Sequence, residues 1–315
     1  MENTMIKKQR YGVEIEMTGI TRAKAAEIVA QTINGRITGP DNTCYHTRKV
    51  IAPDGRKWQI MRDSSIDPQR NDDSREFIDE YKVELVTPIL NYEDIETLQT
   101  IIRNLRAAGA KSHRSCGIHI HVDGANHNGK SLKKLVEFFA NRQDLVYDSL
   151  QIGDRANRWC HKVSKELHEA FRQDREGTNL EALWYSRAND NYYGGINHDH
   201  YNPTRYHGLN LHSYFSKGTV EFRLFNSTLH AGKVKAYIQF CLAVSGWAIE
   251  SADEVTRYNS MAGYTVEKKV TIMRNLLTHR LGLIGAEFDT CRLWMMEPLK
   301  KAAGLSTRIT RSAAA

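Results

Sequence analysis

Four short stretches of this sequence alternate apolar residues with residues that can bind a cation or a phosphate. They are YGVEIEM (11–17), YKVELV (81–86), GIHIHV (117–122) and GTVEFRLF (218–225). Successive side chains of a β-strand point to opposite faces, so the polar members of each stretch would share one face. Those members are Glu14, Glu16, Glu84, His119, His121, Glu221 and Arg223.

If these strands share a sheet, their carboxylates converge and repel one another unless a cation neutralises them. Carboxylate oxygens with one or two imidazole nitrogens suit Mg²⁺ or Mn²⁺ better than zinc. An arginine two residues from a ligand carboxylate would then face a phosphate held by the metal. For one strand alone, a charged face in water is the simpler interpretation. Because the same alternation of apolar and ligand-type residues occurs in four strands, we favour a metal–nucleotide site on one face of a sheet.

A second pattern follows the two histidines directly. GANHNGKS (124–131) fits the GxxxxGKS phosphate-binding loop and lies between an expected strand and an expected helix. The strand before such a loop is normally apolar on both faces, whereas this one carries two histidines. No later apolar run ends convincingly in the aspartate that would hold magnesium. We therefore interpret the segment as a turn through Gly129, with Asn128 or Ser131 capping the next helix.

The rest of the sequence predicts the elements that position these strands. A hairpin is expected over 43–66 around the turn PDG, and a further strand over YHGLNLHSYF (206–215). Helices are expected over 21–33, 92–108, from Ser131 onward, and over 231–250, 264–280 and 287–303. Because strands and helices do not alternate regularly, the pattern favours an α+β fold with a mainly antiparallel sheet packed with helices.

Neither an internal repeat nor a linker interrupts the chain. We expect an N-terminal arm over 1–10, a single catalytic domain over 11–305 and a disordered tail over 306–315. Within the domain, 155–203 mixes helix with polar loop and ends in a segment rich in glycine and asparagine. Such an insertion is typical of a mobile lid over a site.

Composition limits the other function classes. The 315 residues include five cysteines without a CxxC pair, which indicates reduced thiols, a cytoplasmic setting and no zinc knuckle. No apolar run approaches the roughly 20 residues of a membrane helix. The net charge is +7, but no Lys/Arg block with interleaved aromatics predicts a nucleic-acid partner. The sequence leaves the oligomeric state open.

In this order, these stretches resemble the glutamine-synthetase superfamily, and most closely its amidoligase family. WQIMRDSSI (58–66), VELVTPIL (83–90) and RYHGLNLHSYFSKGTVEFRLFNSTLH (205–230) extend the resemblance over about residues 11 to 230. It implies a glutamine-synthetase-like catalytic domain with a curved sheet that binds ATP and two or three Mg²⁺ or Mn²⁺ ions. The metal ligands it implies are Glu14, Glu16, Glu84, His119 and Glu221.

The resemblance also implies roles for residues outside the ligand set. Arg223 would contact phosphate, and His121 would lie near the transferred phosphate or the acyl substrate. Arg205 and Asn210, expected on the strand before TVEFR, match positions that contact substrate or phosphate. Asp63 could hold or deprotonate an amine, or simply form a turn. Two features depart from glutamine synthetase: Glu84 stands where two glutamates are usual, and a separate β-grasp domain is missing.

The activity expected from this resemblance is ATP-dependent ligation of a carboxylate to an amine. ATP would phosphorylate the carboxylate, and the amine would attack the resulting acyl phosphate to form an amide or isopeptide bond. Two alternatives keep the same sheet, a guanidino-kinase-like phosphotransferase and a divalent-metal hydrolase. A P-loop NTPase and a non-catalytic basic binding protein are further alternatives. The sequence names neither the carboxylate, which belongs to a small molecule or a peptide, nor the amine.

Overall fold

An eight-stranded sheet runs through the computed structural model, which describes residues 4–71, 77–188 and 194–305. The strand order is β2-β3-β4-β5-β1-β6-β8-β7, and every pair of neighbours is antiparallel. The strands are β1 (Tyr11–Met17), β2 (Arg36–Thr38), β3 (Arg48–Ile51), β4 (Lys57–Met61), β5 (Val83–Val86), β6 (Gly117–Asp123), β7 (Leu209–Asn210) and β8 (Thr219–Asn226). This confirms the predicted α+β class with a curved antiparallel sheet.

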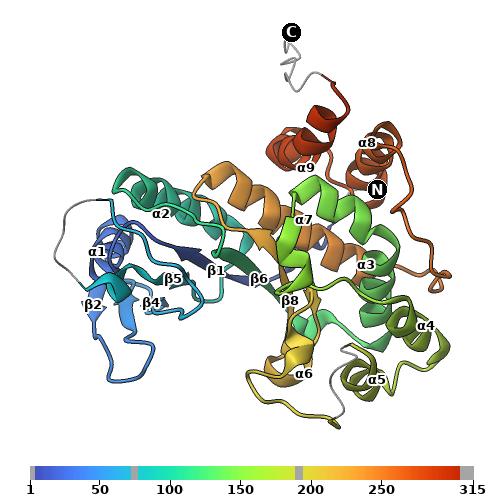
Figure 1. Ribbon diagram of the computed structural model, residues 1–315, viewed down its shortest axis with the longest axis horizontal. Coiled ribbons are helices and arrows are strands. Elements are labelled where there is room, and N and C mark those ends of the chain that lie inside the picture. The colour runs from blue at the N-terminus through green and yellow to red at the C-terminus, as the bar shows by residue number, and fades with distance from the viewer. Residues whose placement is uncertain (1–3, 72–76, 189–193, 306–315) are drawn as a thin grey trace.

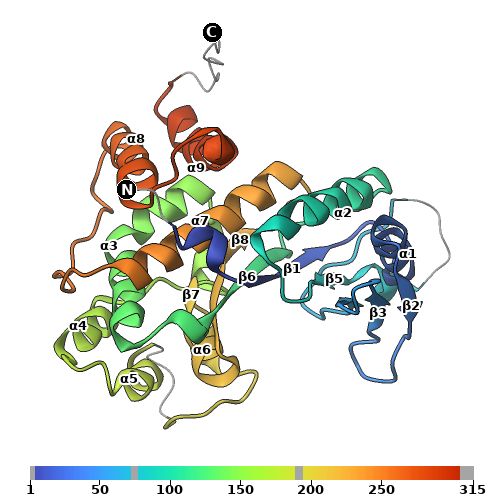
Figure 2. The same cartoon turned by 180° about the vertical axis from the view of Figure 1, so that it is seen from behind.

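Helices cover one face of this sheet and extend beyond its β7 end (Figures 1 and 2). α1 packs on β3 and β4, α7 packs on β6, and α3 and α9 pack on α7. The helices are α1 (Arg22–Ile33), α2 (Ile95–Ala107), α3 (Gly129–Leu150), α4 (Lys165–Gln173), α5 (Leu180–Arg187), α6 (His212–Lys217), α7 (Ala231–Glu250), α8 (Val266–Asn275) and α9 (Asp289–Ala302).

Alternation along the central strands separates the hydrophobic core from the polar face. Ile15 on β1 and Ile118 on β6 are neighbours in the register, and both are fully buried. Leu98, Ile101 and Leu105 of α2 belong to the same core. The strand residues between these apolar positions therefore point to the face away from the helices, where the predicted site residues lie.

Local signals fixed several helix starts. Thr21 accepts a hydrogen bond from the Lys24 amide at the start of α1. Asn128 and Ser131 form a reciprocal capping box at the start of α3, as the interpretation of GANHNGKS as a turn and cap anticipates. The helix predicted over 264–280 continues past α8 as a π-helical turn over Leu276–Arg280.

One predicted strand is wrong. Of residues 206–215, only Leu209–Asn210 pair with β8, and His212–Lys217 form α6 instead. The helix buries His212 and Ser213, and Gly218 ends it in a left-handed conformation with φ 76°. Although LNLHSYF alternates like a strand, burial of one helical face and the glycine cap make most of it helical. Arg205 consequently lies on a 3₁₀ turn, Pro203–Arg205, and not on a strand.

Other expectations concern the ends and the insertion. Residues 4–10 pack on the domain: Ile6 is buried, and the Gln9 side-chain amide donates to the Leu242 carbonyl at 2.8 Å. The insertion over 155–203 contains α4 and α5, while 189–193 and the predicted tail 306–315 lie outside the described residues. Within the described part of the chain, no helix is long and apolar enough to cross a membrane.

Candidate active site

The register of the four central strands places the predicted polar residues next to one another. Glu14 on β1 lies opposite His119 on β6, and Glu16 lies opposite Glu84 on β5. His121 lies opposite Glu221 on β8. Directly opposed residues have Cβ atoms about 4.5–5.5 Å apart, so their side chains can interact. The four stretches that the sequence singled out are therefore consecutive in the sheet, in the order β5-β1-β6-β8.

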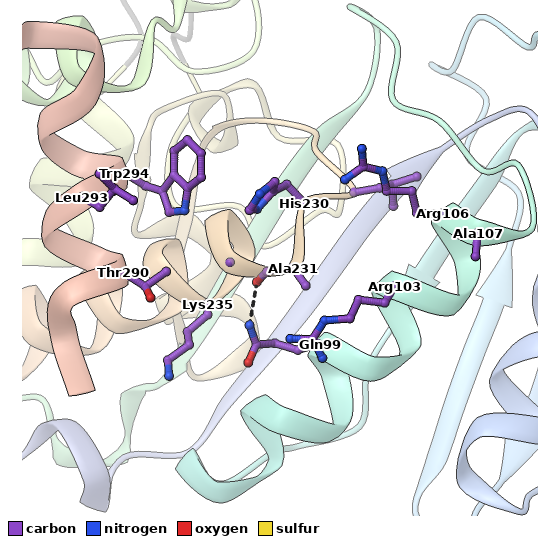
Figure 3. Close-up of a pocket in the computed structure, with 12 residues that line it drawn as sticks. Gln99, Arg103, Arg106, Ala107, His230, Ala231, Lys235, Thr290, Leu293 and Trp294 are labelled. Atoms are coloured by element: carbon purple, nitrogen blue, oxygen red, sulfur yellow. Dashed lines mark hydrogen bonds between the residues drawn. The ribbon is translucent and has the colours of Figure 1, made fainter. Parts of the chain in front are cut away.

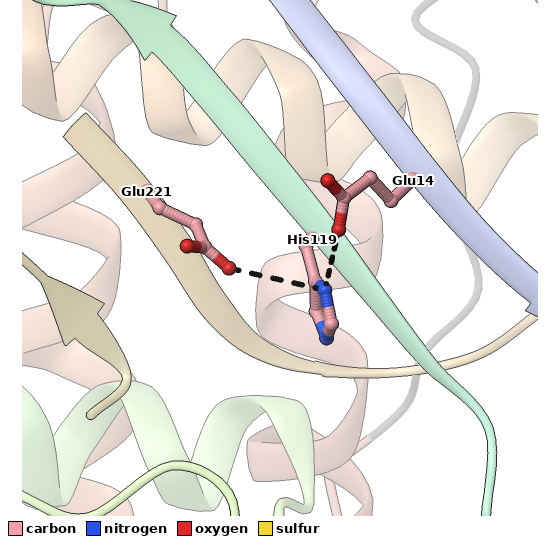
Figure 4. Close-up of side chains that lie close together, drawn as sticks. All are labelled: Glu14, His119 and Glu221. Atoms are coloured by element: carbon pink, nitrogen blue, oxygen red, sulfur yellow. Dashed lines mark hydrogen bonds and ion pairs between the residues drawn. The ribbon is translucent and has the colours of Figure 1, made fainter. Parts of the chain in front are cut away.

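Two overlapping groups of possible metal ligands result, and they share His119. One group is Glu14, His119 and Glu221, and the other is Glu16, Glu84 and His119; the ligand atoms of each lie within 4.8 Å of one another. The His119 Nδ1 atom is 2.9 Å from Glu14 Oε2 and 3.8 Å from Glu221 Oε1 (Figure 4). We call the five residues Glu14, Glu16, Glu84, His119 and Glu221 the carboxylate cluster.

Burial makes this cluster electrostatically unusual. Glu16 and Glu221 are each 4% exposed, and Glu84 is 8% exposed. The Glu16 carboxylate accepts a hydrogen bond from the Gly117 amide at 2.6 Å. No hydrogen bond or ion pair among the described residues involves the Glu84 carboxylate. Carboxylates are rarely buried without a paired charge, because removing them from water is unfavourable.

The pKa values of two members follow from this burial. Burial, and next the negative charge of Asp63, raise the pKa of Glu16 to about 8. Burial, followed by the charges of Glu14 and Glu16, raises the pKa of Glu84 well above its usual value. A divalent cation would relieve both effects, because it neutralises the carboxylates in place of protons. The donor set therefore fits a divalent metal with oxygen and imidazole ligands.

The opposite end of the cluster favours ionised carboxylates. Burial opposes ionisation of Glu221, but Arg223 and then His121 hold its pKa at about 2. Arg223 Nη1 donates to Glu221 Oε1 at 2.7 Å, and Asn210 Nδ2 donates to Glu221 Oε2 at 2.7 Å. Arg223 Nε is buried and has no partner among the described residues. Glu221 is thus held from both sides, while the buried Nε of Arg223 stays unpaired among the described residues.

His121 lies between the same carboxylates. Its Nδ1 atom is 3.0 Å from Thr219 Oγ1, and its Nε2 atom is 3.3 Å from Glu14 Oε1. Burial disfavours the charged imidazolium, yet the charges of Glu221 and Glu14 raise the pKa of His121 above its usual value. For Glu14, burial is likewise outweighed, and His121 and His119 hold its pKa well below the usual value.

A cleft of about 410 Å³ opens over the carboxylate cluster. Asp63 lines it, and its Oδ1 atom also accepts a hydrogen bond from the Ser65 amide, so the predicted turn and the predicted site position coincide. Arg205 lines the cleft too, although its Nη1 atom donates to the His200 carbonyl at 2.7 Å. Asn210 does not line the cleft; its contact is with Glu221.

The strand pattern missed cleft residues that come from loops. Arg155 and Trp159, which follow α3, line both this cleft and an adjoining hollow of about 1010 Å³. The Arg155 guanidinium packs on Gly117, where an added Cβ would lie 2.5 Å from Arg155 Nη2. Across the cleft, the Tyr45 and Tyr201 hydroxyl groups are 3.2 Å apart. Arg155, Trp159 and Tyr201 belong to the insertion over 155–203, which the sequence predicts to lie over a site without singling out these three residues.

GANHNGKS does not take part in the cleft. The Lys130 ammonium donates to the Ala252 carbonyl at 3.0 Å. Gly129 lies against Gly177, whose carbonyl oxygen would be 2.5 Å from a Cβ at position 129. His127 and Ser131 bond to each other at the helix start. The glycine and the serine of the motif thus have structural roles at the start of α3.

Comparison with known proteins adds the family. A family model described as "putative amidoligase enzyme" matches residues 7–245, which include all four site strands. No curated protein and no solved structure gave a match. The description supports an enzyme of the ligase type, in line with the resemblance in the strand motifs. Because the match covers well over half of the chain, the chain belongs to the amidoligase family.

Proposed function

We propose that this protein is an ATP-dependent carboxylate–amine ligase that works in the cleft over β5, β1, β6 and β8. Family membership supports the ligase class. The observation that carries the ATP and metal part is the buried carboxylate cluster, in which Glu16 and Glu84 have raised pKa values that a divalent cation would relieve. If these carboxylates only formed a solvated face of the sheet, they would be exposed to water and not buried.

The cluster offers ligands for more than one Mg²⁺ or Mn²⁺ ion. Glu14, His119 and Glu221 would hold one ion, and Glu16 and Glu84, with His119 within reach, would hold another. When bound, such ions would neutralise the phosphate oxygens of ATP and favour transfer of the γ-phosphoryl group. Asn210 is a positioning residue, because its hydrogen bond fixes one oxygen of Glu221.

Arg223 is the residue best placed to bind the phosphoryl group that moves. Its Nη1 atom is held by Glu221, and its buried Nε atom has no partner among the described residues. A guanidinium fixed in this way is a ready donor for the charge that develops on a phosphoryl oxygen. In the first step, a substrate carboxylate oxygen would attack the γ-phosphorus, forming an acyl phosphate and releasing ADP.

The second step needs an amine and a group that takes its proton. The amine nitrogen would attack the acyl carbon, the C–N bond would form, and the C–O bond to phosphate would break. Asp63 lines the cleft with one carboxylate oxygen engaged by the Ser65 amide, so its other oxygen can accept the ammonium proton. His121 lies beside Glu14 and Glu221, where it would donate to the transferred phosphate or the acyl oxygen.

The acyl substrate would enter from the side of Arg155. This arginine lines both the cleft and the adjoining hollow, and its Nε atom is buried without a partner among the described residues. Trp159 lines the same two spaces, with Arg158 over its ring at 4.6 Å. Arg155 would bind the substrate carboxylate, while Arg205 and Lys217 line the cleft where phosphates would lie.

The test is turnover of ATP·Mg²⁺ with panels of carboxylates and amines, including peptides, while ADP, phosphate and the amide mass are measured. We expect amine-dependent ADP release with an amide product, lost by at least about a thousandfold in Arg223→Ala and Glu221→Gln. Lys130→Ala is the matched control and should keep full activity. ADP release with a phosphorylated, amide-free product would instead identify a phosphotransferase, and turnover without ATP a hydrolase.

A further inference from the structure

A groove of about 850 Å³ lies on the helical side of the sheet, away from the carboxylate cluster. Figure 3 shows Arg103 and Arg106 extending from α2, Lys235 from α7 and Trp294 from α9. Three helices thus contribute to one concave surface, with the first turn of α7 as its floor. The strand motifs of the site do not reach it, and the proposed ligase chemistry makes no use of it.

Three cationic side chains line this groove. Arg103, Arg106 and Lys235 line it, and no carboxylate does so among the described residues. None of the ion pairs between described residues includes these three side chains; the nearby Glu287 is paired with Lys7 at 2.7 Å. Arg103 and Arg106 are three residues apart on one helix face, a spacing at which like charges repel. A bound anion would remove that repulsion.

The groove is also held in shape by its own contacts. Gln99 of α2 donates through Nε2 to the Ala231 carbonyl at 3.1 Å, which joins α2 to the first turn of α7. His230 caps α7 by accepting from the Lys233 amide, and its ring lies 4.8 Å from that of Trp294. Lys233 lies over the same indole at 4.7 Å. The α9 wall is therefore fixed, so a ligand would need little ordering of the protein on binding.

We propose that this groove binds a phosphorylated small molecule, with its phosphate groups between Arg103, Arg106 and Lys235. Arginine and lysine donors converging from two helices suit the several oxygens of a phosphate or diphosphate. The volume lies within the range of small-molecule pockets. A nucleic acid would need cations spread along a strip that follows its backbone, whereas these three gather in one hollow. The binding site is independent of the ligase activity.

Calorimetric titration of the full chain with pyrophosphate, in EDTA and at an ionic strength of about 0.15 M, tests the proposal. EDTA keeps metal–phosphate complexes away from the carboxylate cluster. We expect saturable binding that weakens at least about tenfold in Arg103→Ala/Arg106→Ala and also weakens in Lys235→Ala. Because both arginines are exposed on α2, the variant should keep its thermal unfolding temperature.

Lys300→Ala/Lys301→Ala is the matched control, since it removes two positive charges from α9 outside the groove. It should bind pyrophosphate within about twofold of the unchanged protein, because screening leaves little effect of distant charges. The proposal is overturned if pyrophosphate does not bind saturably, or if binding persists unchanged in the double arginine variant. It is equally overturned if the control loses as much, or if a single-stranded oligonucleotide binds where pyrophosphate does not.

Discussion

Glu84 shows most directly what a single residue contributes to this protein. It is 8% exposed, and none of the hydrogen bonds between described residues reaches its carboxylate, while Glu14 and Glu16 lie beside it. A carboxylate in this setting destabilises the metal-free fold, since either its charge or the proton it must take up is unfavourable at neutral pH. Its retention makes sense if a bound cation uses it.

Glu84→Gln should therefore separate stability from metal binding. At pH 7.5 in EDTA, we expect the free energy of unfolding to rise by about 1–3 kcal/mol, because a buried charge is replaced by a neutral group of similar shape. The added stability that Mg²⁺ gives should disappear. Urea unfolding with and without Mg²⁺ measures both effects. Glu96→Gln, an exposed carboxylate at the start of α2, is the control and should change neither. A less stable metal-free Glu84→Gln protein would contradict this account.

Arg155 is the residue-scale test of where the acyl substrate binds. We expect Arg155→Ala to raise the KM for the carboxylate substrate at least about tenfold, because one charge-assisted hydrogen bond is lost. The KM for ATP should stay within twofold. Steady-state kinetics with each substrate varied in turn makes the distinction. Gly117→Ala should have a similar effect, since its Cβ would displace the Arg155 guanidinium. Equal increases in the KM for the carboxylate and the KM for ATP would show that Arg155 does not bind the acyl substrate.

At the scale of elements, the junction between β6 and α3 has a structural role despite its nucleotide-loop pattern. Gly129 is required by the approach of the Gly177 backbone, and Asn128 and Ser131 cap α3. His127 is 7% exposed and lies between the hydroxyl groups of Ser131 and Ser245, at 3.1 and 2.8 Å. Each conspicuous residue of GANHNGKS thus has a partner that explains it.

Gly129→Ala and Lys130→Ala should act differently for this reason. The added Cβ at 129 meets backbone atoms that cannot move aside easily, so we expect a loss of about 1–3 kcal/mol in the free energy of unfolding. Lys130→Ala loses one exposed contact with the Ala252 carbonyl and should keep both stability and ATP turnover. Chemical denaturation and an ADP-release assay check the pair. Loss of ATP turnover in Lys130→Ala at unchanged stability would show that the loop binds phosphate after all.

His127 also makes this junction sensitive to acid. Burial lowers its pKa from 6.5 to about 4, against the opposing charge of Asp123. Because the pKa is lower in the folded protein, His127 binds a proton more readily in the unfolded chain. The stability that neutral His127 contributes to the fold is therefore fully present above pH 6.5 and is lost as the pH falls towards 4. Between pH 6.5 and 5, we expect the free energy of unfolding to fall by about 1.5 kcal/mol through His127. Urea unfolding at these pH values should show a smaller fall in His127→Gln than in the unchanged chain.

At the scale of the whole molecule, the two faces of the sheet have separate tasks. The helical side holds one continuous core that includes α2, α7 and α9, together with the cationic groove at its surface. The other side exposes the carboxylate cluster to a cleft whose walls come from loops far apart in sequence. The segment after β8 contacts both regions. The Ser227 hydroxyl donates to the Glu16 carbonyl at 2.6 Å, and His230, three residues further along the chain, lines the groove.

Much of the fold and of the candidate site could be predicted because both depend on short-range patterns. The strands with alternating polar residues, the capped starts of α1 and α3, and the order of the long helices follow from local periodicity and capping residues. LNLHSYF misled the prediction, since its alternation is also compatible with a short helix once Gly218 supplies a cap. Arg155, on the 3₁₀ turn Gly153–Asn157, and Trp159 were not singled out because such short irregular segments carry no periodicity that relates them to a distant strand.

The sequence by itself determined which side chains share a face on each strand, because side-chain direction alternates with every residue along an extended chain. It thereby determined that Glu14 and Glu16, or His119 and His121, point the same way. Only the tertiary structure decided that β5, β1, β6 and β8 are consecutive, that Glu16 meets Glu84, and that Arg155 reaches Gly117. Strand order and register depend on contacts between residues more than a hundred positions apart, such as Tyr11 and Val122, which no local pattern encodes.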